Sequence, residues 1–271
     1  MINKIIGKNN NGKKILIISG VHGNELTPIF CTYLLSKCDL NDYDFKKITI
    51  ISGINLKGIQ NNTREIPSIE TNDFNRMFDV EEDIKIIIDE YIKNNDIIID
   101  VHSSPECLEF MLLNQNEYTN SYVNFCKNNN INYLIRYSTA NTIKKYCIDL
   151  NKISFTLELN KMNYIDYNSA ENGKDIILKI IKNCNNLNIQ KSEPIYEPYQ
   201  ELLTYRSGIF CKNNKCGYII TKDDEIGKVL DLITFEEYPI IFKKEGKFKI
   251  ICFGHSSYTD ASNPICLLQP I

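Results

Sequence analysis

The chain has little histidine: only three residues in 271. Histidine is the commonest metal ligand among side chains, so a histidine-based metal site has few positions to draw on. Two of the three, His22 and His102, directly follow apolar runs that predict buried strands. The third, His255, lies in Gly254-His-Ser-Ser-Tyr258 far along the chain, and we expect a structural role for it.

Long apolar runs, an N-terminal secretion signal and a strong charge of one sign are also missing. No apolar segment is long enough to cross a bilayer, and residues 1–7 contain a lysine rather than an extended apolar region. The net charge of −3 provides no basic field that would attract nucleic acid. We therefore expect a cytoplasmic protein with neither nucleic acid nor membrane as a partner. The sequence leaves the oligomeric state open.

Arginine is scarce as well, since only four of the 31 basic residues are Arg and the rest are Lys. Arg offers a planar, bidentate donor that Lys lacks, so the positions that hold Arg are candidates for binding a carboxylate. Arg64 and Arg76 fall within one 13-residue stretch, whereas Arg136 and Arg206 lie elsewhere and match no motif. The first two are the stronger candidates.

The ten cysteines lack the spacing of a disulfide framework or a structural zinc site. Cys211 and Cys216 lie closest together, and no second pair of this kind could complete a four-ligand site. Several others lie in apolar runs, as Cys252 does between Ile251 and Phe253. We expect reduced thiols that act as small buried hydrophobic residues.

Strand-like and helix-like segments alternate from residue 14 to about residue 188. The predicted strands span residues 14–20, 45–52, 96–102, 109–114, 132–136 and 153–159. The predicted helices span residues 25–37, 80–94, 118–127 and 171–185, and residues 54–79 are predicted to form a long loop. This alternation indicates an α/β fold with a largely parallel sheet and helices on both faces.

The pattern changes after residue 189. Residues 192–199 form a proline-bearing linker, and short strand-like runs follow at 217–221, 239–242 and 248–253. We therefore predict two domains: a catalytic domain at residues 1–190 and a small β-rich domain at residues 191–271.

His22 and Glu25 form a His-x-x-Glu turn after the first of these predicted strands. His102 ends another, and the carboxyl ends of parallel strands meet at one edge of a sheet. Two imidazoles and a carboxylate leave a fourth zinc position open, as in catalytic sites. Asp100 lies on the same face of its strand as His102 and could support it from behind. A single histidine after a strand is more often a hydrogen-bonded polar residue than a ligand, so only the combination predicts a metal.

Glu158 is a carboxylate in the otherwise apolar segment Phe155-Thr-Leu-Glu-Leu-Asn160. Burying a carboxylate costs free energy that a specific role must offset. The alternative is a glutamate at a strand end that faces solvent. We expect Glu158 to be a general base toward a zinc-activated water.

The segment Asn72-Asp-Phe-Asn-Arg76 places an amide and a guanidinium side by side in the long predicted loop. Arg76 could bind a carboxylate bidentately, and Arg64 could stabilise the oxyanion of a tetrahedral intermediate. Alternatively, both arginines are exposed loop residues that contribute little.

These segments together resemble the succinylglutamate desuccinylase/aspartoacylase family, a branch of the zinc carboxypeptidase-like hydrolases. Residues 19–25 resemble its first metal motif, and Asp100-Val-His-Ser-Ser104 resembles its second. Residues 55–64 are similar to its Asn-Pro…Thr-Arg segment, with Leu56 where proline is usual. Further similar segments are residues 72–76, 155–158, 206–210 and 224–229.

The resemblance implies a zinc-carboxypeptidase-like mixed sheet and one zinc ion per chain. The implied ligands are His22, Glu25 and His102. Glu158 would be the base and then the proton donor, Arg64 would steady the carbonyl oxygen, and Asn75 and Arg76 would hold a substrate carboxylate. Tyr258 is our candidate for a tyrosine that the β-domain of the family contributes to the substrate.

The implied function is zinc-dependent hydrolysis of the amide bond of a small N-acyl amino acid. One alternative is a metallocarboxypeptidase that acts on a small peptide. Another is a non-catalytic zinc-containing binding protein, against which Glu158 argues because a protein that only holds metal needs no base.

Overall fold

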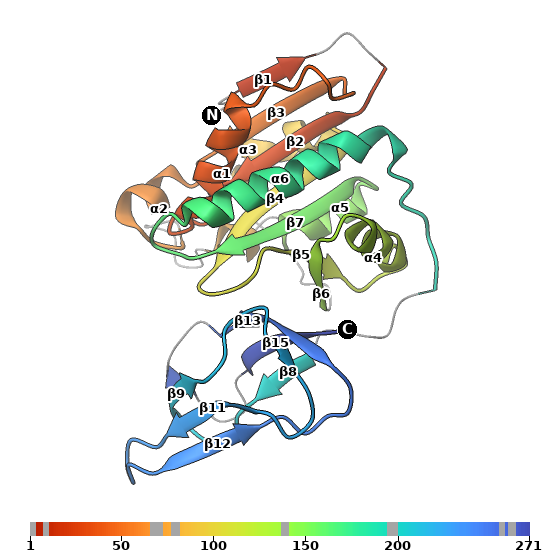
Figure 1. Ribbon diagram of the computed structural model, residues 1–271. Helices are drawn as coiled ribbons and strands as arrows, with labels where there is room; N and C mark the ends of the chain where they lie inside the picture. The colour runs from red at the N-terminus through yellow and green to blue at the C-terminus, as the bar shows by residue number, and fades with distance from the viewer. Residues whose placement is uncertain are drawn as a thin grey trace.

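A seven-stranded sheet forms the centre of the N-terminal part of the chain in this computed structural model (Figure 1). The structure describes residues 4–7, 11–65, 73–76, 82–136, 141–193, 200–254, 258–259 and 264–271. The strands of this sheet are β1 (Lys4–Gly7), β2 (Lys14–Ser19), β3 (Lys47–Ser52), β4 (Ile97–Ser104), β5 (Phe110–Asn114), β6 (Asn132–Arg136) and β7 (Ile153–Asn160). The helices are α1 (Leu26–Lys37), α2 (Leu56–Asn61), α3 (Glu82–Lys93), α4 (Thr119–Asn128), α5 (Ile143–Asp149) and α6 (Tyr167–Asn183), with 3₁₀ turns η1 (Phe74–Arg76) and η2 (Cys184–Asn186).

The sheet is mixed, with strand order β1-β3-β2-β4-β7-β5-β6. Strands β3, β2, β4 and β7 are parallel to their neighbours in that series. β1 pairs antiparallel with β3, and β5 pairs antiparallel with β7 but parallel with β6. The prediction of a mixed, largely parallel sheet is therefore confirmed.

Helices cover both faces of the sheet because its strands are apolar on both sides. In β2, Ile15 and Ile17 pack into a core that includes residues of α1, α4 and α6, the helices on one face. Leu16 and Ile18 point the other way, into a core that includes residues of α3 and α5. Figure 1 shows α1 and α6 crossing the near face of the sheet.

The prediction of a long loop at residues 54–79 is wrong in part, because α2 and η1 lie within this range. Asn55 caps α2 through Oδ1, which accepts a hydrogen bond from Gly58 N at 2.8 Å. Gly58 inside a six-residue helix lowers its intrinsic helix propensity, so the pattern gave no helical signal. α5 was also not predicted, and α6 begins at Tyr167 rather than at residue 171.

The C-terminal part contains two four-stranded antiparallel sheets, ordered β10-β13-β15-β8 and β12-β11-β9-β14. Their strands are β8 (Gln200–Leu203), β9 (Gly208–Lys212), β10 (Ile219–Ile220), β11 (Glu225–Leu230), β12 (Glu237–Ile241), β13 (Phe248–Phe253), β14 (Tyr258–Thr259) and β15 (Pro264–Pro270). The expected β-rich character is confirmed, although the sequence indicated only β10, β12 and β13. The division into domains at residue 190 stays a prediction.

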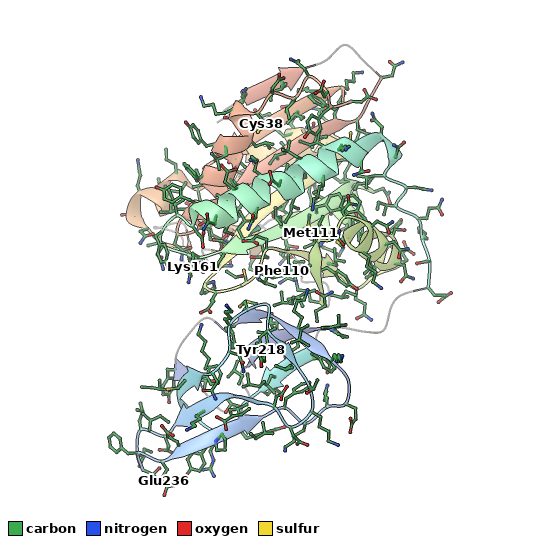
Figure 2. All side chains as sticks on the ribbon, in the orientation of Figure 1. Cys38, Phe110, Met111, Lys161, Tyr218 and Glu236 are labelled. Carbon is green, nitrogen blue, oxygen red and sulfur yellow. The ribbon has the colours of Figure 1, made fainter. Side chains whose placement is uncertain are left out.

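The C-terminal sheets contact the large sheet beside the carboxyl ends of its strands. Cys107, after β4, forms a β-bridge with Cys252 of β13, in which Leu108 N donates to Ile251 O at 2.9 Å. Phe110 and Cys252 belong to one apolar cluster, whereas the next residue along β5, Met111, packs in the core under α4 and α6 (Figure 2). Among the described residues, no helix is long and apolar enough to span a bilayer.

Candidate active site

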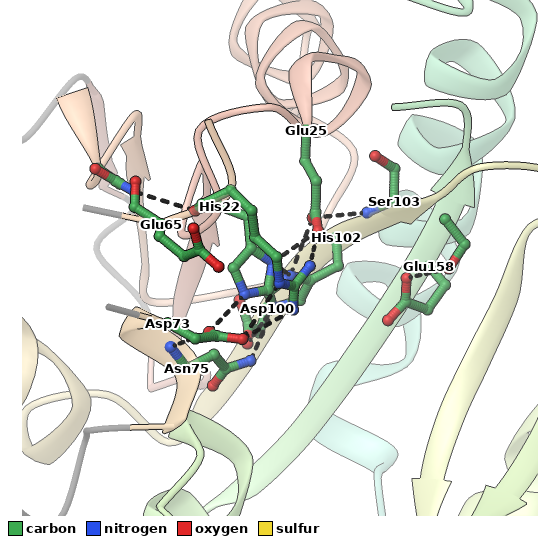
Figure 3. A network of polar contacts seen from close by, with 12 residues as sticks. His22, Glu25, Glu65, Asp73, Asn75, Asp100, His102, Ser103 and Glu158 are labelled. Atoms are coloured by element: carbon green, nitrogen blue, oxygen red, sulfur yellow. Dashed lines mark hydrogen bonds and ion pairs between the residues drawn. The ribbon is translucent and has the colours of Figure 1, made fainter. Parts of the chain in front are cut away.

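Three buried side chains, His22, Glu25 and His102, converge at the carboxyl ends of β2 and β4 (Figure 3). The turn between β2 and α1 carries His22 and Glu25, and His102 lies in β4, which pairs with β2. His22 Nδ1 lies 2.7 Å from Glu25 Oε1 and 3.2 Å from His102 Nδ1. His102 Nδ1 lies 3.1 Å from Glu25 Oε2. The predicted ligand set is thus brought together at one point.

The outward-facing ring nitrogens of both histidines are held by carboxylates. His22 Nε2 lies 3.0 Å from Asp73 Oδ1, and His102 Nε2 lies 2.9 Å from Asp100 Oδ2. An ionised carboxylate can only accept, so each Nε2 donates and each Nδ1 is left available to coordinate a metal. Asp100 was predicted for this supporting position, and Asp73 was not.

The donor set fits a zinc ion. Zinc–nitrogen bonds of about 2.0–2.1 Å in a tetrahedral site place ligand atoms about 3.3 Å apart, close to the 3.2 Å between the two Nδ1 atoms. Two imidazoles and one carboxylate are also the ligand types that catalytic zinc sites combine.

The charges of the cluster favour an ionised Glu25. Burial alone would raise the pKa of Glu25, but the adjacent His22 and His102 outweigh it and hold that pKa well below its usual range. Burial would likewise lower the pKa of His102, yet Asp100 and Glu25 raise it well above the usual value. The pKa of Asp73 is lowered by His22 and by Arg64 and Arg76 despite its partial burial. The site therefore stabilises positive charge at its centre.

The Glu25 side chain contacts the two histidines and does not cap the helix that follows it. Glu25 occupies the N-cap position of α1, where a side chain commonly accepts from the helix N–H groups, but it makes no such bond. Its carboxylate instead accepts from Ser103 N at 2.9 Å, besides contacting the two histidines.

The turn that carries His22 is packed directly on α2. A Cβ at Gly23 would lie 2.0 Å from the carbonyl carbon of Gly58, so only glycine fits there. Gly23 N donates to Arg64 O at 3.2 Å, and the Asn55 side chain donates to the same carbonyl at 3.3 Å. The first metal motif and the segment from Asn55 to Arg64 are therefore one local structure.

Glu158 lies in β7 directly opposite His102 of β4. Its Oε2 accepts a hydrogen bond from Ser104 Oγ at 3.1 Å, and the side chain is half-buried. Figure 3 shows this carboxylate on the strand beside the histidine cluster. Glu158 thus lies on the strand next to the converging side chains, and its role as a base stays a prediction.

Arg64 and Asn75 both contact the cluster. Arg64 donates from Nη1 to Glu25 Oε1 at 3.2 Å and from Nε and Nη2 to Asp73 Oδ2. Asn75 is buried, and its Oδ1 accepts from Ile143 N at the start of α5. Arg76 is exposed and donates to Asn75 O.

A cavity of about 470 Å³ is lined by seven of the predicted residues: His22, Glu25, Arg64, Asn75, Arg76, His102 and Glu158. Residues of the C-terminal sheets also line it, including Tyr258, the predicted tyrosine, which is 48% exposed. Arg206 is not among its lining residues and instead lies over the Tyr238 ring. His255 falls outside the described residues.

Lys144 and Arg136 also line this cavity, although neither was assigned a role from the sequence. Lys144 is 7% exposed, and its Nζ donates to Leu112 O. Burial and the nearby Arg136 guanidinium lower the pKa of Lys144 to about 7. A second cavity of about 160 Å³ shares Lys144 as a lining residue. No sequence signal distinguishes Lys144 from its neighbour Lys145.

The expectation of buried thiols holds for seven of the ten cysteines. All ten lie within the described residues and are free thiols, but Cys38 and Cys216 are half-buried and Cys211 is exposed.

In comparison with known proteins, residues 11–184 match the succinylglutamate desuccinylase/aspartoacylase catalytic domain. An aspartoacylase family protein from Mesorhizobium loti has a TM-score of 0.78 at 17% identity, over 98% of this chain and 88% of that one. A succinylglutamate desuccinylase/aspartoacylase from Rhodobacter sphaeroides has a TM-score of 0.75 at 14% identity, over the same shares. The product-bound ectoine utilization protein EutE (DoeB) from Ruegeria pomeroyi has a TM-score of 0.72 at 17% identity, over 97% and 87%. Among curated proteins, none matches the chain.

Proposed function

The chain belongs to the succinylglutamate desuccinylase/aspartoacylase family, and we propose that it is a zinc-dependent deacylase that hydrolyses the amide bond of a small N-acyl amino acid. The observation that carries this proposal is the convergence of His22, Glu25 and His102 beside Glu158 in one cavity. A protein that only stored metal would not need a carboxylate on the adjacent strand facing the same space.

His22, Glu25 and His102 would hold the zinc, each oriented by the contacts described above. When bound there, zinc would supply Lewis acidity to the amide carbonyl and to water. The fully buried ligands and their carboxylate partners favour a single fixed geometry.

Glu158 is the proton carrier in this proposal. Ser104 occupies its Oε2, and its Oε1 accepts the proton of the water that attacks the amide carbonyl. The same carboxyl group then donates that proton to the nitrogen of the leaving amino acid. The products are a free carboxylic acid and an amino acid.

Arg64 stabilises the negative charge that develops on the carbonyl oxygen. Three of its five N–H groups donate to Glu25 and Asp73, which leaves two for the oxygen. Asn75 and Arg76 would bind the carboxylate of the amino-acid part, an arrangement that a guanidinium favours. Tyr258 would contact the substrate from the C-terminal sheets.

A small substrate is favoured over a long peptide because the cavity is walled on two sides. Tyr258, Ile265 and Leu267 of the C-terminal sheets line it together with residues of β4 and β7. A metallocarboxypeptidase would need room for the rest of a peptide chain.

The substitution Glu158→Gln tests the proposed base. We expect the variant to bind one zinc ion per chain, measured by mass spectrometry of metals, and to lose at least about 100-fold in kcat. Glu245→Gln, at an exposed carboxylate outside the cavity lining, is the control and should keep full activity. Hydrolysis at the wild-type rate by Glu158→Gln would show that another group is the base.

A panel of N-acetyl amino acids, N-succinyl amino acids and small peptides tests the reaction itself. Zinc-loaded protein should release amino acid from N-acyl amino acids. Cleavage of peptides alone would favour the carboxypeptidase, and zinc binding without any hydrolysis would favour a non-catalytic protein.

A further inference from the structure

The smaller cavity, of about 160 Å³, is separate from the space around the metal ligands. Among the described residues, Lys144 is the one that lines both cavities. The walls of the small cavity come from the end of β5, from α4 and α5, and from the start of β7. Neither the metal ligands nor Glu158 lines it, so it has no part in the proposed hydrolysis.

The small cavity lies where β5 and β7 stop pairing. Their ladder ends at Leu112 and Thr156, and the cavity is lined by Asn114 and Ser154, two residues away on each strand. Ser154 N donates to the Tyr122 hydroxyl at 3.1 Å, so a side chain rather than a strand accepts from this N–H. Hydroxyl groups are therefore placed at the point where the strands part.

Two buried hydroxyl groups line this cavity, those of Ser154 and Tyr122. Ser154 is 3% exposed, and among the described residues its Oγ has no hydrogen-bond partner, although it lies close to the Tyr122 oxygen. Burial raises the pKa of Tyr122 to about 12, so this hydroxyl keeps its proton at neutral pH. A buried hydroxyl without a partner costs free energy, and a ligand that accepted its hydrogen bond would offset that cost.

The cavity is also lined by a buried cation. Lys144 is 7% exposed, and its ammonium donates one N–H to Leu112 O, which leaves two for other acceptors. Lys152 lines the cavity too, although its ammonium donates to Lys93 O at the surface. None of the described residues that line this cavity is acidic. Positive charge and hydroxyl donors without a carboxylate favour an anion.

Three isoleucines, Ile148, Ile153 and Ile189, give the small cavity an apolar lining as well. Each methylene group that a ligand buries against such side chains contributes about 0.8 kcal/mol. An inorganic anion would leave this lining without a contact. A carboxylate with a short aliphatic chain matches both the donors and the isoleucines.

We propose that the small cavity binds a short-chain aliphatic monocarboxylate. Its carboxylate accepts hydrogen bonds from Lys144, Ser154 and Tyr122, and its chain contacts the three isoleucines. Binding of this ligand requires neither zinc nor hydrolysis. The proposed hydrolysis releases a carboxylic acid, so a short acyl product is a ligand of this class, and this assignment alone rests on the proposed function.

Calorimetric titration with butyrate at pH 6, where Lys144 holds its proton, tests the site. We expect a dissociation constant of about 1 mM or tighter. Butyramide has the same shape without the charge and should bind at least about 10-fold more weakly. Acetate lacks two methylene groups and should also bind about 10-fold more weakly. Equal binding of butyrate and acetate would show that the isoleucines do not contact the chain.

Labelling of isoleucine methyl groups with ¹³C separates the two cavities by nuclear magnetic resonance. The signals of Ile148, Ile153 and Ile189 should shift on addition of butyrate, both with zinc and after chelation, because no metal ligand lines the small cavity. Shifts confined to Ile265, which lines the large cavity, would overturn the proposal.

Ser154→Ala should weaken butyrate binding at least about 10-fold, because it removes a hydrogen bond to a charged group. Thr156→Val is the matched control, since this hydroxyl lies two residues away on β7 and lines the large cavity but not the small one. Its dissociation constant should change by less than about twofold. Thermal melting establishes that each variant is folded. Equal binding by Ser154→Ala and the wild type would refute the site.

The binding site and the proposed function fail independently. If the protein hydrolyses no N-acyl amino acid but binds butyrate as described, the site stands and its assignment to a reaction product is wrong. If the protein hydrolyses N-acyl amino acids but does not bind butyrate, the site is refuted and the deacylase function is retained.

Discussion

Replacing Lys144 by methionine should make the folded protein more stable at pH 6. Burial and the nearby Arg136 lower the pKa of Lys144 from 10.5 to about 7 on folding, which corresponds to a cost of about 5 kcal/mol. The substitution removes this cost but leaves the carbonyl of Leu112 without its donor, a loss of about 1–3 kcal/mol. The variant should therefore gain about 2–4 kcal/mol in free energy of unfolding.

The gain in free energy of unfolding that Lys144→Met shows over the wild type should disappear as the pH rises. Between pH 7 and 10.5 the unfolded chain holds a proton on Lys144 that the folded chain has lost, so the wild type gains stability with pH across this window. The groups facing Lys144 are Arg136, Asp100, Cys126 and Cys147. Burial raises the pKa of Cys126 to about 12 and raises that of Cys147 further, so both thiols stay protonated at pH 10.

Urea unfolding at pH 6, 8 and 10 in the presence of a chelator measures this difference without metal linkage. The difference between Lys144→Met and wild type should fall by about 4 kcal/mol from pH 6 to pH 10, whereas Lys145→Met should show a small, constant difference. A Lys144→Met variant less stable than wild type at pH 6, or a difference independent of pH, would refute the view that this ammonium is buried at a cost.

Three further predictions concern the metal site and the thiols. Asp100→Asn should weaken zinc binding about 10- to 100-fold in a competition titration with a chelator, because His102 loses the carboxylate that orients it. An unchanged zinc affinity would show that Asp100 does not support His102 in binding the metal. Gly23→Ala should lower the free energy of unfolding by about 3 kcal/mol or more and reduce the zinc content, because its Cβ would overlap the backbone of Gly58; a stable, fully metallated variant would show that the turn is not packed on α2. A thiol reagent should modify one cysteine rapidly in the native protein and all ten after unfolding, and Cys211→Ser should abolish the rapid reaction.

The convergence of His22, Glu25 and His102 was predictable because each lies in a short local pattern. His22 and Glu25 share one turn, and His102 ends an apolar strand, so strand order alone brings them together. Asp73 lay in a segment noted for Asn75 and Arg76, but its contact with His22 joins residues 51 positions apart. No periodicity encodes such a contact.

The burial of Lys144 could not be predicted from the sequence, and the reason differs from that for Asp73. Lys144 and Lys145 are adjacent and identical in type, and the helix that separates their environments has only seven residues. Only the packing of α5 against the sheet buries the first and leaves the second half-buried, where it pairs with Asp149. Strand β14 of the C-terminal sheets was not predicted either, since it has only two residues.

Lys144 lies between two cavities, because it lines both the large one and the smaller one of about 160 Å³. Asn114 of β5 and Ser154 of β7 line the smaller space, and Leu112 and Thr156 of the same two strands line the larger one. Shortening this one side chain would enlarge both spaces and remove a positive charge from each. A single substitution at position 144 would therefore change the volume and the charge of the cavity together rather than independently.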